Sequence, residues 1–162
     1  SWFLKGSGGK PGYRRIVNKW FIFHLLIGLV ITLVVGLKLS DCANFISLAM
    51  TSFLLSNVIL LKRIHMLLQS KEIERLSKYH KGGFVEYVYT FHTSTLIIFI
   101  AFVLWILAGL QLFEIRDFEV YFGINVLLFT IFSLSIREFW HIIVGIQTLL
   151  IIQKKIKQTC LI

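Results

Sequence analysis

Four long apolar runs separated by polar connections dominate the pattern of this chain. They cover residues 20–39, 43–61, 91–113 and 120–139. Each run is about 20 residues long, which is the length that an α-helix needs to cross the hydrocarbon of a bilayer. The pattern therefore predicts an all-α integral membrane protein that forms a four-span helical bundle.

Two further stretches are predicted to be helices on the inner side of the membrane. Residues 62–78 keep apolar side chains at helical spacing and carry charged side chains on the opposite face, as an amphipathic helix does. Residues 139–157 follow the fourth run and remain mostly apolar. An apolar helix outside the hydrocarbon needs cover, which lipid headgroups, the 62–78 helix or another subunit would provide.

Arg137 and Glu138 mark the predicted end of the fourth span. Charged side chains inside a membrane are costly unless they are paired or lie at an interface. With a span over 120–139, the pair lies at the inner interface and Trp140 acts as an aromatic anchor. The alternative is a span over 134–153, which would bury the pair in the membrane.

The distribution of Lys and Arg predicts which side of the membrane each terminus occupies. Five lie within residues 1–19, six within 62–90 and three within 154–157, whereas the opposite side carries only Lys38 and Arg116. By the positive-inside rule, both termini lie inside, in the cytosol or in the mitochondrial matrix.

This topology divides the chain into two parts. Residues 1–19 are predicted to form a basic, flexible amino-terminal arm, because they include a glycine-rich segment and no acidic residue. Residues 20–162 are predicted to form a single transmembrane helical domain. The connection over Ser40–Ala43 is expected to be a tight turn between the first two spans.

Composition agrees with the membrane assignment and changes how the net charge is interpreted. The chain has 162 residues, of which 57% are hydrophobic, with 15 Phe and a single Pro. A net charge of +9 would indicate nucleic acid in a water-soluble protein. Here the cations lie between the apolar runs, so no nucleic-acid partner is expected. Cys42 and Cys160 fall on opposite predicted faces, so neither a disulfide nor a metal site is expected.

Small and polar side chains predict where helices pack against one another. Gly28, Thr32 and Gly36 recur every four residues in the first run, which would let another helix approach closely. Polar side chains of the second run are expected to hydrogen-bond locally or between helices; they are Ser47, Thr51, Ser52, Ser56 and Asn57.

Four predicted helices each contribute a histidine near the inner boundary of the membrane: His24, His65, His92 and His141. Imidazole is amphipathic, and its placement at a membrane edge needs no ligand. Two facing imidazoles can also be axial ligands of a haem, and a neutral imidazole can relay protons. No zinc-ligand spacing and no nucleophile, base and acid set are present, so no catalytic residue is predicted.

The sequence HIIVGIQ, which begins at His141, resembles the H-x-x-x-G-I-R-H motif of the membrane cytochrome b subunit of succinate dehydrogenase. HLLIG, which begins at His24, is similar to the S-x-x-H-R-x-x-G motif of the same family. The resemblance implies a respiratory complex of the mitochondrial inner membrane with haem b and quinone. It makes His141 the axial haem ligand. We expect His24 or His92 to be the second cofactor-binding residue.

Two other local resemblances lead to a related and to a competing function. HIIVG is also similar to the H-V-x-x-G of cytochrome oxidase subunit III, another respiratory membrane protein. Residues 52–76 resemble the part of insect odorant and gustatory receptors in which the second span continues into a charged helix. That resemblance implies the front half of a ligand-gated channel of the plasma membrane.

We expect an integral membrane subunit of a multi-subunit respiratory complex, which anchors or scaffolds other subunits and contributes to a haem b or quinone site. Such a subunit would have no catalytic activity of its own, although it would belong to an oxidoreductase. Its partners would be the bilayer and the other membrane subunits. The alternatives are a chemoreceptor-type channel fragment and a small transporter or lipid-modifying membrane protein.

Overall fold

Each described part of the chain holds one helix. The computed structural model describes residues 19–35, 39–71, 83–113 and 117–159. The helices are α2 (Lys19–Val35), α3 (Leu39–Leu68), α5 (Gly83–Gly109) and α6 (Phe118–Thr159). These described residues contain no strand, so the all-helical prediction is confirmed for them.

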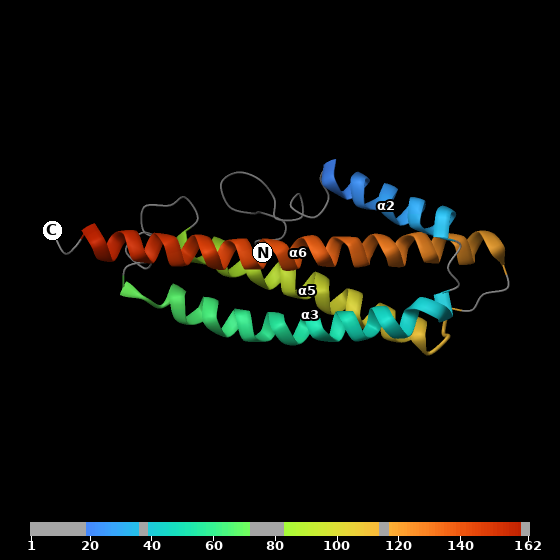
Figure 1. The fold of residues 1–162 in the computed structure, drawn as a ribbon, viewed down its shortest axis with the longest axis horizontal. Helices are drawn as coiled ribbons and strands as arrows, with labels where there is room; N and C mark the ends of the chain where they lie inside the picture. Colours follow the sequence, from blue (N-terminus) through green and yellow to red (C-terminus); the bar gives the residue numbers. More distant parts are fainter. Residues whose placement is uncertain (1–18, 36–38, 72–82, 114–116, 160–162) are drawn as a thin grey trace.

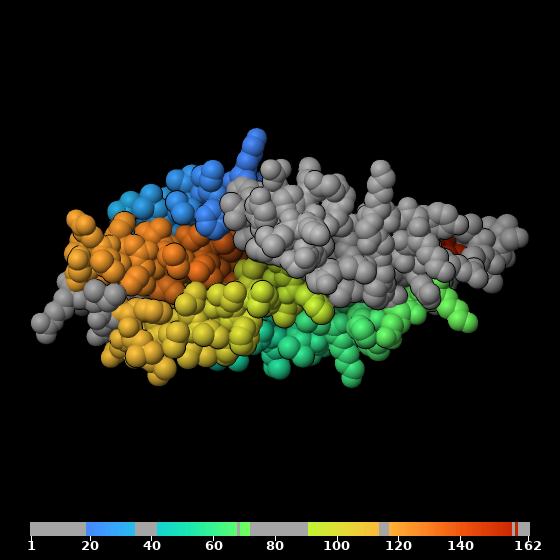
Figure 2. Space-filling model, turned by 180° about the vertical axis from the view of Figure 1, so that it is seen from behind, coloured from blue at the N-terminus to red at the C-terminus, as the bar shows by residue number. Residues whose placement is uncertain are grey.

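α6 is the longest helix, and the other three pack along it. Its 42 residues form one continuous helix, which is about 63 Å long at the usual rise per residue. α2 lies against one side of α6, and α5 packs on another side with α3 beyond it (Figure 1). Seen from behind, α5 lies between α3 and α6, and α2 lies along the side of α6 that is opposite to α5 (Figure 2).

The direction of each helix follows from which residues meet. Ser94 of α5 contacts Glu138 of α6, and Phe91 lies beside Gly145, so these two helices are antiparallel. α2 is antiparallel to α6, and α3 is antiparallel to α5. α3 and α6 therefore run in the same direction, and their Phe53 and Phe139 rings stack with centroids 5.0 Å apart.

Capping hydrogen bonds define the end of α5 and the start of α6. After Gly109 the chain turns through Gln111, which has a φ of 60°. Leu112 N donates to Leu107 O at 3.2 Å and Gln111 N donates to Ala108 O at 3.0 Å, the pattern of a Schellman motif. α6 begins where Glu119 N donates to Asp117 Oδ1 at 3.0 Å, a side-chain cap that satisfies a terminal backbone donor.

The interior contains two apolar clusters with polar side chains between them. One cluster is built around Met50, Trp105 and Leu128, and the other around Phe91 and Ile142. Between them along the bundle lie polar residues that contact one another in pairs, which we call the polar layer: His24, Asn57, Ser94, Thr95, Ser133, Arg137 and Glu138. The polar layer lies near the middle of α6.

Among the described residues, three helices are long and apolar enough to cross a membrane, over Cys42–Leu67, Phe91–Gly109 and Phe118–Ile156. α2 is apolar but shorter, with 17 residues, which is close to the lower limit of about 17 for a spanning helix. The lengths agree with an integral membrane protein. The inside location of both termini and the exact span limits stay predictions.

Three predicted boundaries need correction or extension. The tight turn over Ser40–Ala43 is wrong, because α3 already begins at Leu39; Ser and Asp are favoured at a helix start. The predicted 62–78 helix is the continuation of α3. It ends at Leu68, where Ser70 N donates to Leu67 O at 3.1 Å. Residues 72–78 lie outside the described residues.

The predicted 139–157 helix is the second half of α6. The basic arm lies outside the described residues, except that Lys19 begins α2.

Candidate functional site

A buried ion pair forms the centre of the polar layer. The carboxylate of Glu138 is only 1% exposed, and its Oε1 accepts from Arg137 Nη2 at 2.6 Å and from Arg137 Nε at 3.1 Å. Its Oε2 accepts from Ser94 Oγ of α5 at 2.6 Å. Both carboxylate oxygens are thus hydrogen-bonded, as a buried charge requires.

The structure changes the interpretation of Arg137 and Glu138. The sequence predicts that this pair lies at the membrane interface, with a buried position as the alternative. In the structure, Glu138 is buried within the protein, so lipid and water do not contact it whichever span limits apply. Consecutive residues of a helix point in different directions, yet the long Arg137 side chain reaches the carboxylate of its neighbour.

His24 is the second element of the polar layer. It lies on α2, is buried, and its Nδ1 lies 2.7 Å from Ser133 Oγ of α6. Its Nε2 is also buried and has no hydrogen-bond partner among the described residues.

Gly28 allows this contact between α2 and α6. A Cβ built on Gly28 would lie 2.6 Å from Val126 O and 2.9 Å from Thr130 N, so the two backbones approach closely. The predicted close helix approach along the Gly28 stripe is confirmed at Gly28. Gly36 lies outside the described residues.

Hydrogen bonds of the α3 side chains agree with their predicted roles. Asn57 Nδ2 donates to Thr95 Oγ1 of α5 at 3.1 Å, an interhelical bond. Ser47, Thr51 and Ser52 donate to carbonyl oxygens three or four residues earlier in α3. Only Asn57 of these four therefore links α3 to another helix.

The other three predicted histidines lie on the surface. His65 on α3, His92 on α5 and His141 on α6 are exposed. His65 Nε2 lies 3.0 Å from Gln69 Nε2. His24 is level with Ser133, and His141 is eight positions further along α6, about 12 Å at the rise of a helix. The four imidazoles therefore do not share one level.

The geometry limits how a haem could be held. Two axial ligands must reach one iron from opposite faces, but His24 is directed at Ser133 and is separated from His141 along α6. Between α5 and α6 near His92 and His141, the space is filled by buried Phe91 and Ile142. His24 and His141 therefore lie at different levels of the bundle, and a haem role for this pair stays a prediction. A ligand role for His141 or His92 stays a prediction.

Metal binding by the chain itself receives no support from the described residues. They contain no group of three His, Cys, Asp or Glu side chains that could hold an ion. Cys42 is half-buried, and Cys160 lies outside the described residues.

Sequence reasoning missed Ser94 and Ser133 as members of the polar layer. Both are ordinary hydroxyl residues in apolar runs, and no local pattern distinguishes them from Ser or Thr that bond to their own helix. The spacing of Ser133 and Arg137, four residues apart on α6, is the one signal that they share a face. Their partners lie on helices 44 and 109 residues away in sequence.

Comparisons with protein-family models, with curated proteins and with solved structures find no match for this chain.

Proposed function

We propose that the protein is an integral membrane subunit of a larger assembly, and that α6 provides much of the surface for its partners. The observation that carries this proposal is the length of α6, 42 residues without a break. The hydrocarbon of a bilayer covers only about 20 residues of a helix. Half of α6 must therefore lie outside the hydrocarbon.

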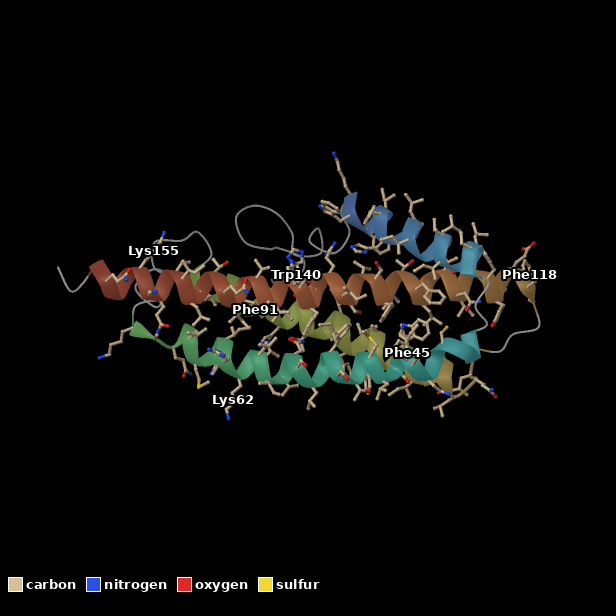
Figure 3. The ribbon with its side chains drawn as sticks, in the orientation of Figure 1. Phe45, Lys62, Phe91, Phe118, Trp140 and Lys155 are labelled. Carbon is tan, nitrogen blue, oxygen red and sulfur yellow. The ribbon has the colours of Figure 1, made fainter. Side chains whose placement is uncertain are left out.

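The half of α6 that follows Glu138 exposes large apolar side chains among polar ones. Trp140 is 64% exposed, and Val144 and Ile151 are exposed as well. Figure 3 shows Trp140 projecting from the middle of α6 and Lys155 near its end. Exposed apolar surface that lipid does not cover is typical of contacts with another protein. The absence of a predicted catalytic set agrees with a subunit that anchors or scaffolds.

The resemblance around His141 supports a respiratory complex as the assembly. In that assembly the protein lies in the mitochondrial inner membrane and contributes His141, with His92 on neighbouring α5, to a haem b or quinone site that a partner completes. A haem would supply one-electron transfer when bound. The exposure of both imidazoles makes them accessible to a partner subunit.

The test is native electrophoresis of the protein extracted from its own membrane in mild detergent, with an optical spectrum and mass spectrometry of the band. We expect a large complex with oxidoreductase subunits and a Soret band. Replacement of His141 by Ala should remove that band, whereas His65→Ala, an exposed histidine on α3, should retain it. A small colourless species would contradict the respiratory assignment.

A second function is favoured by one observation. α3 passes from its apolar part through Lys62 and Arg63 to Leu68 without interruption, as the resemblance to insect chemoreceptors implies. In that case the chain is the front part of a ligand-gated channel of the plasma membrane. A transcript that encodes further spans after Ile162 would support this function, and a stop codon directly after Ile162 would contradict it.

A further inference from the structure

We infer that a groove between α3 and α5 binds one anionic phospholipid from the leaflet that adjoins Lys62. Two openings of about 450 Å³ and 640 Å³ lie on the surface of the bundle at these two helices. His92 lines both, so the two openings adjoin at this residue, and we call them together the groove.

The groove walls are two stripes of side chains at helical spacing. On α3 the stripe contains Leu54, Val58, Leu61 and His65; on α5 it contains His92, Thr95, Leu96 and Phe99. Residues three or four apart lie on one face of a helix. Each stripe therefore faces the groove from one of two antiparallel helices. The hydrogen bond from Asn57 to Thr95 holds the two helices together along it.

The part of the groove that is farther from Lys62 suits an acyl chain. It is lined mainly by Leu54, Val58, Leu96 and Phe99, and the last three of these are exposed. From Leu54 to His65 the groove extends over eleven residues of α3, about 16 Å. One leaflet contributes about 15 Å of hydrocarbon, so the groove is as long as one leaflet is deep.

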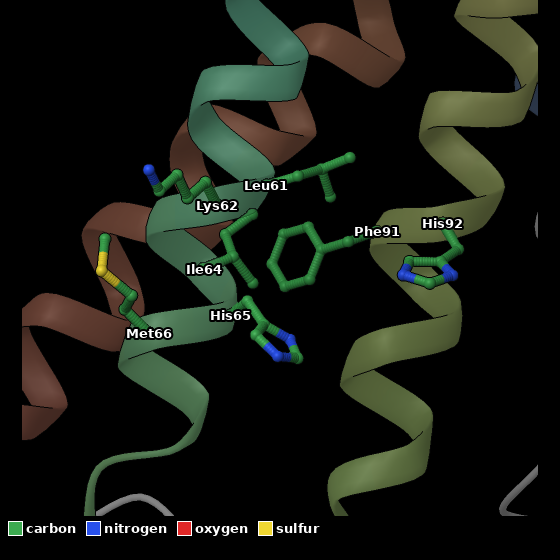
Figure 4. Close-up of a pocket in the computed structure, with 7 residues that line it drawn as sticks. All are labelled: Leu61, Lys62, Ile64, His65, Met66, Phe91 and His92. Carbon is green, nitrogen blue, oxygen red and sulfur yellow. The ribbon is translucent and has the colours of Figure 1, made fainter.

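The end of the groove at Lys62 suits an anionic headgroup. Lys62 lines it at the point where the apolar part of α3 ends, and Arg63 follows at the exposed surface. In Figure 4, the His65 imidazole projects from α3 toward α5 and the Phe91 ring projects from α5 toward α3. An amide nitrogen donates, so Gln69 Nε2 donates to His65 Nε2, which leaves Nδ1–H as a donor for a phosphate oxygen.

Charge complementarity selects the occupant. Basic pockets between membrane helices bind the headgroups of anionic lipids, and none of the described residues that line the two openings is Asp or Glu. The cationic group of a zwitterionic lipid would lie near Lys62 and would be repelled by it. Such a lipid would therefore gain less binding free energy than an anionic one.

The test uses the full-length protein purified in detergent and incubated with equal amounts of phosphatidylglycerol and phosphatidylcholine. Native mass spectrometry then counts the lipids that remain bound. We expect phosphatidylglycerol to be retained preferentially. Lys62→Gln, which removes the cation, and Leu96→Trp, which fills the groove, should each lower its retention at least fivefold.

Two control variants make the same changes elsewhere. Lys154→Gln removes an exposed cation from α6, and Leu48→Trp enlarges an exposed side chain of α3 outside the groove. Both should retain the lipid as the wild type does. Equal loss in these controls, no loss in Leu96→Trp, or equal retention of phosphatidylcholine would each overturn the proposal. If Leu96→Trp does not fold, Val58→Trp replaces it, with the same expected loss.

Discussion

At the scale of single residues, Glu138 is the side chain whose environment differs most from a typical membrane position. An ionised carboxylate away from water is stable only with charged and hydrogen-bonding partners. Arg137 lies on the same helix, whereas Ser94 comes from α5. The carboxylate therefore links α5 and α6 at one rotation and one register, because a shift of either helix would separate its oxygens from their donors.

Replacement of Glu138 by Ala should destabilise the protein by about 3–5 kcal/mol, the usual cost of breaking a buried ion pair. Ser94→Ala should cost about 1.5–3 kcal/mol, because it removes one hydrogen bond to a charged group. Thermal unfolding in detergent, followed by fluorescence-detected size exclusion, measures both effects. Glu119→Ala, which removes an exposed carboxylate of α6, is the matched control and should unfold close to the wild type. A Glu138→Ala protein as stable as the wild type would show that the contacts of Glu138 with Arg137 and Ser94 do not stabilise the packing of α5 on α6.

At the scale of elements, the contact between α2 and α6 depends on a glycine. Apolar side chains attract helices only weakly in lipid, so close backbone packing is what holds membrane helices together. Gly28 lets Val126 and Thr130 approach α2, and the hydrogen bond between His24 and Ser133 forms one turn away. α2 packs mainly on α6, so loss of this contact would free it from the bundle.

Gly28→Ala should destabilise the α2 contact by about 1–3 kcal/mol, because its Cβ would overlap backbone atoms that cannot rotate away. Gly123→Ala is the matched control on α6, since a Cβ there meets nothing within 4 Å. It should be neutral or stabilise α6 by up to about 1 kcal/mol, through helix propensity. The same unfolding assay compares the two variants. Equal stability of both would mean that α2 does not pack on α6 through Gly28.

At the scale of the whole molecule, α6 is longer than the hydrocarbon of the bilayer is thick. Its two ends must therefore lie on opposite sides of the membrane. Figure 3 shows Phe118 at one end of α6 and Lys155 near the other, with Lys62 toward the same end as Lys155. The positive-inside rule predicts that the end with Lys62 and Lys155 is the inner one. The exposed apolar side chains after Glu138 then lie on the inner side, where partner subunits would cover them.

Single cysteines in a background with Cys42→Ala and Cys160→Ala test this arrangement. A membrane-impermeant thiol reagent should label Lys154→Cys only from the inner side and Phe118→Cys only from the outer side, and should leave Leu127→Cys unlabelled. Trp140→Cys should be protected in the native membrane and labelled after purification away from partners. Labelling of Trp140→Cys in the native membrane would contradict the proposal that a partner covers α6.

The sequence by itself determined the helical class, the approximate position of each apolar helix and the membrane character. These properties follow from composition and from spacing within a few turns, which are local. Capping at Asp117 and the local hydrogen bonds of Thr51 and Ser52 are local in the same sense. The sequence also indicated Gly28 as a packing position and Asn57 as a hydrogen-bonding position.

Only the tertiary structure decided what surrounds each polar side chain. The rotation of a helix about its axis and its register against a neighbour depend on packing between residues far apart in sequence. His24 meets Ser133 across 109 positions, and Ser94 meets Glu138 across 44. For that reason the sequence could place four histidines on four helices, but it could not show that His24 lies in the interior while His65, His92 and His141 lie on the surface.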